Sequence, residues 1–133
     1  MLFRSIKDRV NEIKRRQKFR PFAPAVLEEY ADVCFELLGH DSRFMQYAPL
    51  CRTPHLLPGA IHYDGTSRVQ TVPNNGTGFR KLLEAWYEKT GCPMLLNTSL
   101  NIKGKPIVNN TLDATAFEKH YGVPVFTHNL KKV

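Results

Sequence analysis

Two stretches of the chain show the apolar spacing of a helix most clearly. Residues 79–89 predict a helix with a wide apolar face that ends at Gly91, since glycine is common just past a helix C-terminus. Residues 5–16 predict a helix with a narrower apolar stripe, which consists of Ile6, Val10 and Ile13. Each helix therefore has one face to bury against the rest of the fold.

Two weaker patterns also predict helices. Residues 28–38 place apolar side chains on one face and are followed by Gly39, which can end a helix. Residues 111–120 have the same helical character, with Thr111 as a candidate N-cap and Gly122 at the other end.

Short apolar runs between these helices predict strands. Residues 93–96 are wholly apolar, as in a strand buried on both faces. Residues 19–27 are predicted to be extended. Pro21 and Pro24 place them at a sheet edge or in a rigid turn, because proline donates no ladder hydrogen bond. Further strands are predicted at residues 43–50, 60–63, 69–72 and 123–126. This alternation predicts an α/β or α+β fold, with residues 1–133 forming one domain.

The positive charge is concentrated at one end of the chain. The sequence has 19 Lys and Arg against 12 Asp and Glu, a net charge of +7, and residues 1–20 alone contribute +6. Such clustering suits a polyanionic partner: nucleic acid, a membrane surface or a small phosphorylated substrate. A solvated basic helix face is the alternative.

Within that segment, Lys14, Arg16 and Arg20 are the strongest candidates for binding phosphate. Lys14 and Arg16 are predicted at the end of a helix, and Arg20 on a rigid extended segment, so the three cations can converge. Arginine offers a planar fork to phosphate oxygens and lysine a compact charge. Alternatively, the cations only solvate the helix and favour its negative C-terminal end. Phe19 and Phe22 lie among them, and core aromatics are a better interpretation than a nucleic-acid stacking platform.

A second candidate is the polar turn at residues 97–101, which holds Ser99 and Asn101 and directly follows a predicted buried strand. The carboxyl ends of strands are where open α/β sheets bind ligands, and such a turn presents hydroxyl and N–H groups to an anion. A turn that satisfies only its own hydrogen bonds is the alternative.

A third candidate surrounds His62, Asp64 and Arg68. Two metal ligands without a third nearby are weak evidence, so we predict no metal site and favour a structural turn that presents Arg68 to a ligand. The sequence contains no Walker A motif, no GxGxxG and no Gly-x-Ser-x-Gly elbow. A nucleotide site would have to be built another way.

The composition mainly indicates the cellular compartment in which the protein is expected. No apolar run approaches the roughly 18 residues of a membrane span, and the first residues do not read as a secretory signal. Three scattered cysteines, in no CxxC pair, favour reduced thiols buried as small apolar residues in a cytoplasmic protein.

Taken in order, these motifs resemble the C-terminal domain of the NodU/CmcH carbamoyltransferases. The resemblance runs over roughly residues 6–120 and is carried by Lys14-x-Arg16 through residues 19–27, by residues 62–72, and by residues 95–108 with Ser99-x-Asn101. That domain is similar to YrdC-like domains, so the resemblance implies a twisted, open mixed sheet with flanking helices.

The resemblance also implies an activity. ATP and carbamoyl phosphate would be converted to carbamoyl adenylate, with Mg²⁺ expected, and a separate domain or partner chain would pass the carbamoyl group to an acceptor hydroxyl. By position, Lys14, Arg20 and Arg68 would be catalytic and bind phosphates, together with Arg16. Ser99 and Asn101 would lie at the nucleotide. No protein nucleophile is needed, because charge neutralisation and positioning supply the catalysis.

Two departures from the family pattern bear on this expectation. The chain opens almost at the Lys-x-Arg segment, so the metal-containing acceptor domain is expected to be absent and the domain to be N-terminally truncated. Gln17 stands where an acidic residue is usual. A catalytically inert truncated YrdC-like domain is therefore one alternative. An RNA-binding module is the other, because residues 1–20 carry +6 and the YrdC-like resemblance allows it, although nucleic acid is the less favoured partner.

Overall fold

A computed structural model describes residues 2–17 and 20–126 of the chain. The elements in chain order are α1 (Leu2–Ile13), β1 (Ala23–Leu27), η1 (Glu28–Tyr30), α2 (Ala31–Cys34), η2 (Pro58–Ala60), β2 (Gln70–Val72), α3 (Gly78–Thr90), β3 (Met94–Asn97) and α4 (Thr111–Tyr121). In this described part, no helix combines the length and apolar character that a membrane span requires.

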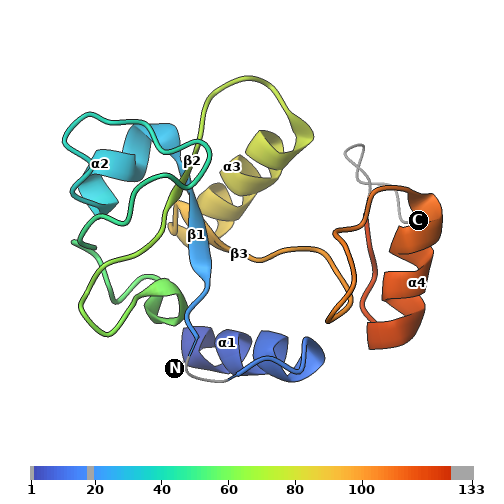
Figure 1. Ribbon diagram of the computed structural model, residues 1–133. Coiled ribbons are helices and arrows are strands. Elements are labelled where there is room, and N and C mark those ends of the chain that lie inside the picture. Colours follow the sequence, from blue (N-terminus) through green and yellow to red (C-terminus); the bar gives the residue numbers. More distant parts are fainter. Residues whose placement is uncertain (1, 18–19, 127–133) are drawn as a thin grey trace.

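The three strands form one mixed sheet in the order β2-β1-β3. β1 pairs in parallel with β2, from Ala25 opposite Gln70, and antiparallel with β3, from Ala23 opposite Asn97. Helices flank this open sheet (Figure 1), which confirms the mixed α/β fold expected from the sequence.

The sequence-based placement of Pro24 at a sheet edge is wrong, because β1 is the central strand. The N–H of Leu27 donates to the carbonyl of Pro93 on the β3 side, so the nitrogens of Pro24 and Val26 face β2. The β1–β2 pairing starts only at Ala25. Pro24 therefore occupies a position where the ladder has no hydrogen bond to lose.

The two faces of β1 bury different parts of the chain. On one face, Val26 packs in a cluster with Phe35, Val69 and Met94. On the other face, Ala25 and Leu27 pack with Val72 and with Leu83 of α3. The central strand is thus packed on both faces, and this packing fixes the position of its first residues.

The three cysteines lie in or against the first of these clusters, as free thiols. Cys34 and Cys92 are buried and Cys51 is half-buried. Burial raises the pKa of the Cys34 and Cys51 thiols, which keeps them neutral. The expectation of cysteines that pack as small apolar residues is confirmed.

The helices with glycine at a left-handed C-cap match the sequence best. The C-cap of α3 is Gly91 (φ 70°) and that of α4 is Gly122 (φ 66°), as expected. The N-cap of α4 is Asn110 rather than Thr111, since the Asn110 side chain accepts the N–H of Asp113 at 2.9 Å. α1 ends at Ile13, earlier than the predicted residue 16.

Several short elements differ from the prediction. The helix expected at residues 28–38 stops at Cys34, because Phe35 is extended and forms a β-bridge with Cys51. In this position the side chain of Phe35 is completely buried. Residues 43–50 and 60–63 form no strand, only an isolated bridge at Leu50. Residues 123–126 hold a single bridge residue, Phe126.

The segment after β3 packs around its own small core. Ala114 and Phe117 of α4 contact Val125, with half-buried Ile102 and Val108 at the edge. In Figure 1, α4 stands apart from the sheet, and the chain between β3 and α4 passes above the end of α1. This C-terminal segment (residues 98–126) forms one wall of the site described next.

Candidate anion-binding site

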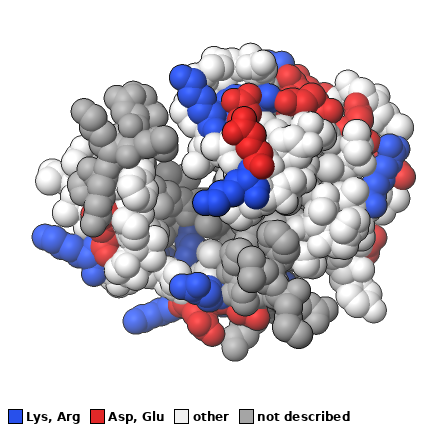
Figure 2. Space-filling model, turned by 180° about the vertical axis from the view of Figure 1, so that it is seen from behind, with Lys and Arg blue, Asp and Glu red and all other residues white. Residues whose placement is uncertain are grey.

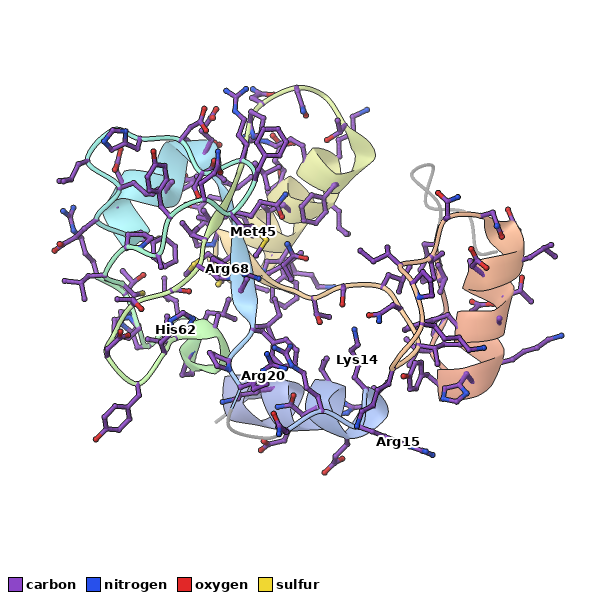
Figure 3. The ribbon with its side chains drawn as sticks, viewed as in Figure 1. Lys14, Arg15, Arg20, Met45, His62 and Arg68 are labelled. Atoms are coloured by element: carbon purple, nitrogen blue, oxygen red, sulfur yellow. The ribbon has the colours of Figure 1, made fainter. Side chains whose placement is uncertain are left out.

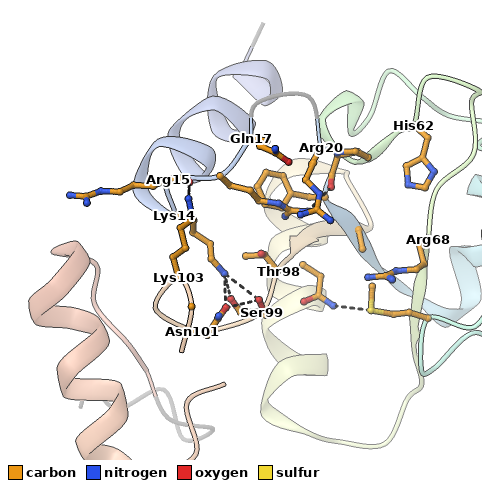
Figure 4. A pocket seen from close by; sticks show the side chains of 17 residues that line it. Lys14, Arg15, Gln17, Arg20, His62, Arg68, Thr98, Ser99, Asn101 and Lys103 are labelled. Carbon is orange, nitrogen blue, oxygen red and sulfur yellow. Dashed lines mark hydrogen bonds between the residues drawn. The ribbon is translucent and has the colours of Figure 1, made fainter. Parts of the chain in front are cut away.

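A cavity of about 1030 Å³ lies where β1 and β2 begin and β3 ends. The residues expected to bind phosphates or the nucleotide all line it, from three separate parts of the chain (Figures 3 and 4): Lys14, Arg16, Arg20, Arg68, Ser99 and Asn101. The lining residues are Lys14, Arg15, Arg16, Gln17, Arg20, Pro21, Phe22, Ala23, Met45, His62, Arg68, Asn97, Thr98, Ser99, Asn101, Lys103 and Gly104. Only β3 contributes its carboxyl end, whereas β1 and β2 contribute the segments that precede them.

The charge of this lining is entirely positive among the residues that the structure describes. Six of its lining residues are cations and none is Asp or Glu. The side chains of Arg20 and Arg68 form no hydrogen bond or ion pair with residues 2–17 and 20–126, and the backbone N–H of Arg20 donates to the Gln17 carbonyl at 3.2 Å. Burial, followed by the charges of Arg20 and Arg68, lowers the pKa of Arg16. Three guanidinium groups therefore lie close together without a counter-charge.

Arg16 is held in place before any ligand arrives. Its Nη2 donates to the carbonyl of Pro21 at 3.4 Å, and its guanidinium lies 4.8 Å from the ring centroid of Phe22. Phe22 is buried, which confirms the core-aromatic interpretation, and the guanidinium of Arg16 lies over its ring. Phe19 lies outside the described residues.

Lys14 reaches across the cavity to the turn after β3. Its Nζ donates to Asn101 Oδ1 at 3.1 Å, to Ser99 Oγ at 3.3 Å and to the Ser99 carbonyl. Figure 4 shows these contacts as a fan of bonds from one ammonium group. Burial lowers the pKa of Lys14, with a smaller contribution from the charge of Arg16.

The local backbone explains why Lys14 and Arg16 both face the cavity. They follow the end of α1 instead of ending the helix, and Arg15 between them is left-handed (φ 48°). The N–H of Arg16 donates to the carbonyl of Asn11 at 2.9 Å, which closes the turn against the helix. In Figure 4 the Arg15 side chain extends away from the other cations.

The side chain of Asn97 forms a hydrogen bond within the sheet. Its Nδ2 donates to Gln70 Oε1 at 2.6 Å, so a polar bridge joins the two outer strands β2 and β3 across the start of β1. Met45, which is left-handed (φ 60°), lies beside the same amide at 3.9 Å. Asn97, Thr98, Ser99 and Asn101 of the predicted polar turn all line the cavity.

The His62–Asp64 segment forms a hydrogen-bonded turn. Thr66 donates its N–H and its hydroxyl to Asp64 Oδ1 at 3.0 and 2.7 Å, and His62 Nδ1 lies 2.9 Å from the Thr66 hydroxyl. These hydrogen bonds lower the pKa of Asp64. His62 lines the cavity and Asp64 does not. Within the described ranges, no three His, Cys, Asp or Glu residues come together as metal ligands would.

Sequence reasoning missed Arg15, Met45 and Lys103 as lining residues. Lys103 is a cation in a polar loop, and its Nζ lies 3.0 Å from the carbonyl of Arg15. The two residues are 88 positions apart in the sequence. No pattern within the sequence connects the two. Met45 had been placed in a strand that does not form.

Comparisons with known proteins agree with the resemblance noted above. The family model described as carbamoyltransferase C-terminus matches residues 2–129. The nodulation protein NolNO of Sinorhizobium fredii is 46% identical over 116 residues, which are 81% of this chain and 17% of that protein. The 3'-hydroxymethylcephem-O-carbamoyltransferase of Amycolatopsis lactamdurans is 34% identical over 119 residues, 88% of this chain and 22% of that protein.

A third relative, nodulation protein U of Azorhizobium caulinodans, is 40% identical over 105 residues, 77% of this chain and 19% of that protein. The chain thus spans about a fifth of the length of these relatives. Because the family model covers nearly the whole sequence, the chain belongs to the carbamoyltransferase C-terminal family.

Proposed function

We propose that this chain binds ATP and carbamoyl phosphate and forms carbamoyl adenylate for an O-carbamoyltransferase reaction. The observation that carries the proposal is the convergence of cations from three separate segments on one cavity without a carboxylate among its described lining residues. Positive charge without a counter-charge, half-buried at Lys14 and Arg16 and exposed at the other cations, favours an anion from outside. The name of the Amycolatopsis relative supplies the reaction class.

The chemistry needs the positions of two phosphorylated substrates to be fixed together. Water releases phosphate from carbamoyl phosphate, an oxygen of the resulting carbamate attacks the α-phosphorus of ATP, and pyrophosphate leaves. Negative charge builds on the phosphoryl oxygens during that attack. Fixed guanidinium and ammonium groups stabilise this charge without reorganising.

The geometry supports a division of roles among the predicted residues. Arg20 and Arg68, without partners among the described residues, would hold phosphate groups, and the stacked Arg16 would supply a fixed third charge. Lys14 would share its ammonium between a phosphate oxygen and its present acceptors on Ser99 and Asn101. Those two residues would thereby lie at the nucleotide.

Mg²⁺, which the family resemblance implies, does not fit the lining as a protein-held ion. Magnesium prefers carboxylate, water and phosphate oxygens, and the described lining offers no carboxylate. Gln17, on the cavity wall, is a neutral amide. We therefore assign no protein ligand to the metal and derive no step from it.

Delivery of the carbamoyl group to an acceptor hydroxyl is assigned to a separate domain or partner chain. In the relatives above, the part that matches this chain is about a fifth of the protein. Within the described residues, the charged cavity contains no carboxylate that could act as a base toward a hydroxyl.

Pyrophosphate release tests the proposal directly. The purified chain is incubated with ATP and carbamoyl phosphate, and pyrophosphate is measured for the wild type, Lys14→Ala, Arg20→Ala and the surface control Lys81→Ala on α3. We expect release by the wild type and the control only. Release that persists in both cavity variants would refute the site assignment.

A thermal melt with and without ATP separates this proposal from an inert domain. A ligand present at about 100 times its Kd adds roughly 2.7 kcal/mol to the free energy of unfolding. If ATP leaves the melting temperature unchanged at millimolar concentration, the chain does not bind the nucleotide and the proposed function is wrong.

A further inference from the structure

Two lysines cross between the end of α1 and the loop after β3. Lys14 extends from the first segment to Ser99 and Asn101 of the second. Lys103 extends in the opposite direction, and its Nζ donates to the carbonyl of Arg15 at 3.0 Å. The turn at residues 14–17 is here named the phosphate turn. Its first two residues, Lys14 and Arg15, are both hydrogen-bonded to the loop after β3.

The phosphate turn needs such a tie because its backbone is strained. Arg15 has φ 48°, a left-handed conformation that is uncommon outside glycine, asparagine and aspartate. Residues held there cost free energy and persist only where the surroundings fix them. This conformation directs Lys14 and Arg16 to the cavity while the Arg15 side chain extends away (Figure 4).

Lys103 itself sits on a well-anchored turn. Its N–H donates to the hydroxyl of Tyr121 on α4 at 3.0 Å, and the Tyr121 ring packs against Phe117 with 4.9 Å between centroids. The Asn101 amide donates to the carbonyls of Ile102 and Lys105 at 3.2 and 3.1 Å, which closes the same turn. A continuous path of hydrogen bonds therefore leads from α4 to the Arg15 carbonyl.

We propose that Lys103 is a positioning residue: by holding the Arg15 carbonyl, it keeps Lys14 and Arg16 aimed at the phosphates of the ligand. The C-terminal segment is then part of the phosphate site, although α4 itself does not line the cavity. This inference rests on the proposed function, because it needs a phosphate ligand in the cavity.

The competing explanation is that Lys103 only adds charge, since it also lines the cavity. Arg15 provides the matched comparison. Arg15→Met removes a lining cation but keeps the carbonyl that Lys103 contacts, whereas Lys103→Met removes a lining cation and the contact together. Charge effects fade at high salt, because the Debye length falls from about 10 Å at 0.1 M to about 3 Å at 1 M.

The experiment measures the affinity for inorganic pyrophosphate and for ATP by calorimetry at low and high salt. The variants are Lys103→Met, Lys103→Arg, Arg15→Met and the neighbouring surface control Lys105→Met. We expect Lys103→Met to weaken binding about tenfold at both salt concentrations, the size of one charged hydrogen bond. Lys103→Arg should restore most of the affinity. Arg15→Met removes charge only, so its smaller loss should disappear at high salt. Lys105→Met should stay within about twofold of the wild type.

A loss in Lys103→Met that equals the loss in Arg15→Met and disappears at high salt would overturn the inference and leave a charge effect. Unchanged binding in Lys103→Met would also overturn it, and in both cases the proposed function stands. If the wild type binds neither ligand, the proposed function fails first and the inference with it.

A ligand-free measurement guards against a variant that only loses stability. Hydrogen exchange at the Arg16 N–H, which donates to the Asn11 carbonyl, reports directly on the phosphate turn. We expect faster exchange there in Lys103→Met, while the amides of β1 keep their wild-type rates. Equal acceleration in β1 would mean general destabilisation and would count against a positioning role.

Discussion

The two ends of β2 carry arginines in opposite circumstances. Past its last residue, Val72, lies Arg80, whose side chain is 4% exposed and bound by Glu29, Glu84 and the Val72 carbonyl. Before its first residue, Gln70, lies Arg68, which faces the cavity with Arg16 and Arg20 and no lining carboxylate among the described residues. Figure 2 shows the molecule from behind, and on that face acidic side chains lie beside basic ones in several places, unlike the described lining of the cavity.

The difference separates a structural charge from a ligand-binding one. Hydrogen bonds with Glu29, followed by those with Glu84, raise the pKa of Arg80, so the fold itself stabilises that cation. At the other end, burial and then the neighbouring cations lower the pKa of Arg16, so the fold carries that charge at a cost. The first cluster is neutralised by carboxylates within the chain, whereas the second has no carboxylate among its described lining residues, as the proposed binding of an anion requires.

The largest effect is expected for Arg80→Met. It leaves the Val72 carbonyl without a donor and two carboxylates without a partner, and breaking a buried pair costs about 3–5 kcal/mol. We expect the lower end, about 3 kcal/mol less free energy of unfolding, because the two glutamates are half-exposed. Urea unfolding measures it, and the remaining folded protein should bind ATP as before.

Acid titration gives this prediction a second readout. The hydrogen bond from Arg80 lowers the pKa of Glu29 in the folded chain. The unfolded chain therefore binds more protons, so this stabilisation is present above the ordinary Glu pKa and is lost as pH falls through the lowered value. Arg80→Met should flatten that part of the curve. An unaltered curve would contradict the ion pair.

A smaller but more diagnostic effect is expected at the other end of β2. Arg20→Ala and Arg68→Ala should each weaken pyrophosphate binding at least about tenfold, since each removes a charged hydrogen bond. Neither should lower the free energy of unfolding, because removal of a like charge relieves repulsion around Arg16. Arg43→Ala is the matched control, because Arg43 is paired with Glu28 and Asp41 on the surface. Loss of stability in step with loss of binding would erase the contrast with Arg80.

The smallest effect concerns the pH dependence of binding through Lys14. Burial lowers its pKa from the ordinary value of 10.5, so its ammonium loses the proton earlier than a surface lysine as pH rises. We expect pyrophosphate affinity to fall several-fold over that range, and Lys14→Arg to remove the fall because arginine keeps its charge.

The unfolding free energy should move in the opposite direction. Between the folded and unfolded pKa values of Lys14, the unfolded chain binds more protons, so stability rises with pH. Measuring both curves for the wild type and Lys14→Arg cancels the titration of pyrophosphate itself. Identical binding curves would place Lys14 outside the site.

The contrast between the two arginine clusters also marks what the sequence could predict. Lys14, Arg16, Arg20, Arg68, Ser99 and Asn101 were chosen from local motifs and family resemblance, and they line one cavity. The network around Arg80 was not predicted, because Arg80 and Glu29 are 51 positions apart in the sequence. They meet only when α3 packs on the sheet.

The fold follows the same rule. α3 and α4 were predicted closely because a helix is encoded by contacts within a few residues and by a terminal glycine. The position of β1 at the centre of the sheet could not be read from its prolines, since it depends on where β2 starts its pairing. Likewise Phe35 leaves the helical path for a partner, Cys51, that no local pattern identifies.

The hydrogen bond between Gln70 and Asn97 sets a size limit on the central strand. Gln70 is opposite Ala25 and Asn97 is opposite Ala23, so the two amides meet over two of the smallest side chains available. Ala23 also lines the cavity. Any larger residue at position 23 must take its volume either from the bridge that ties the outer strands or from the space left for the ligand. The hydrogen bond between the outer strands and the ligand cavity therefore use the same space beside position 23, and alanine is small enough to leave room for both.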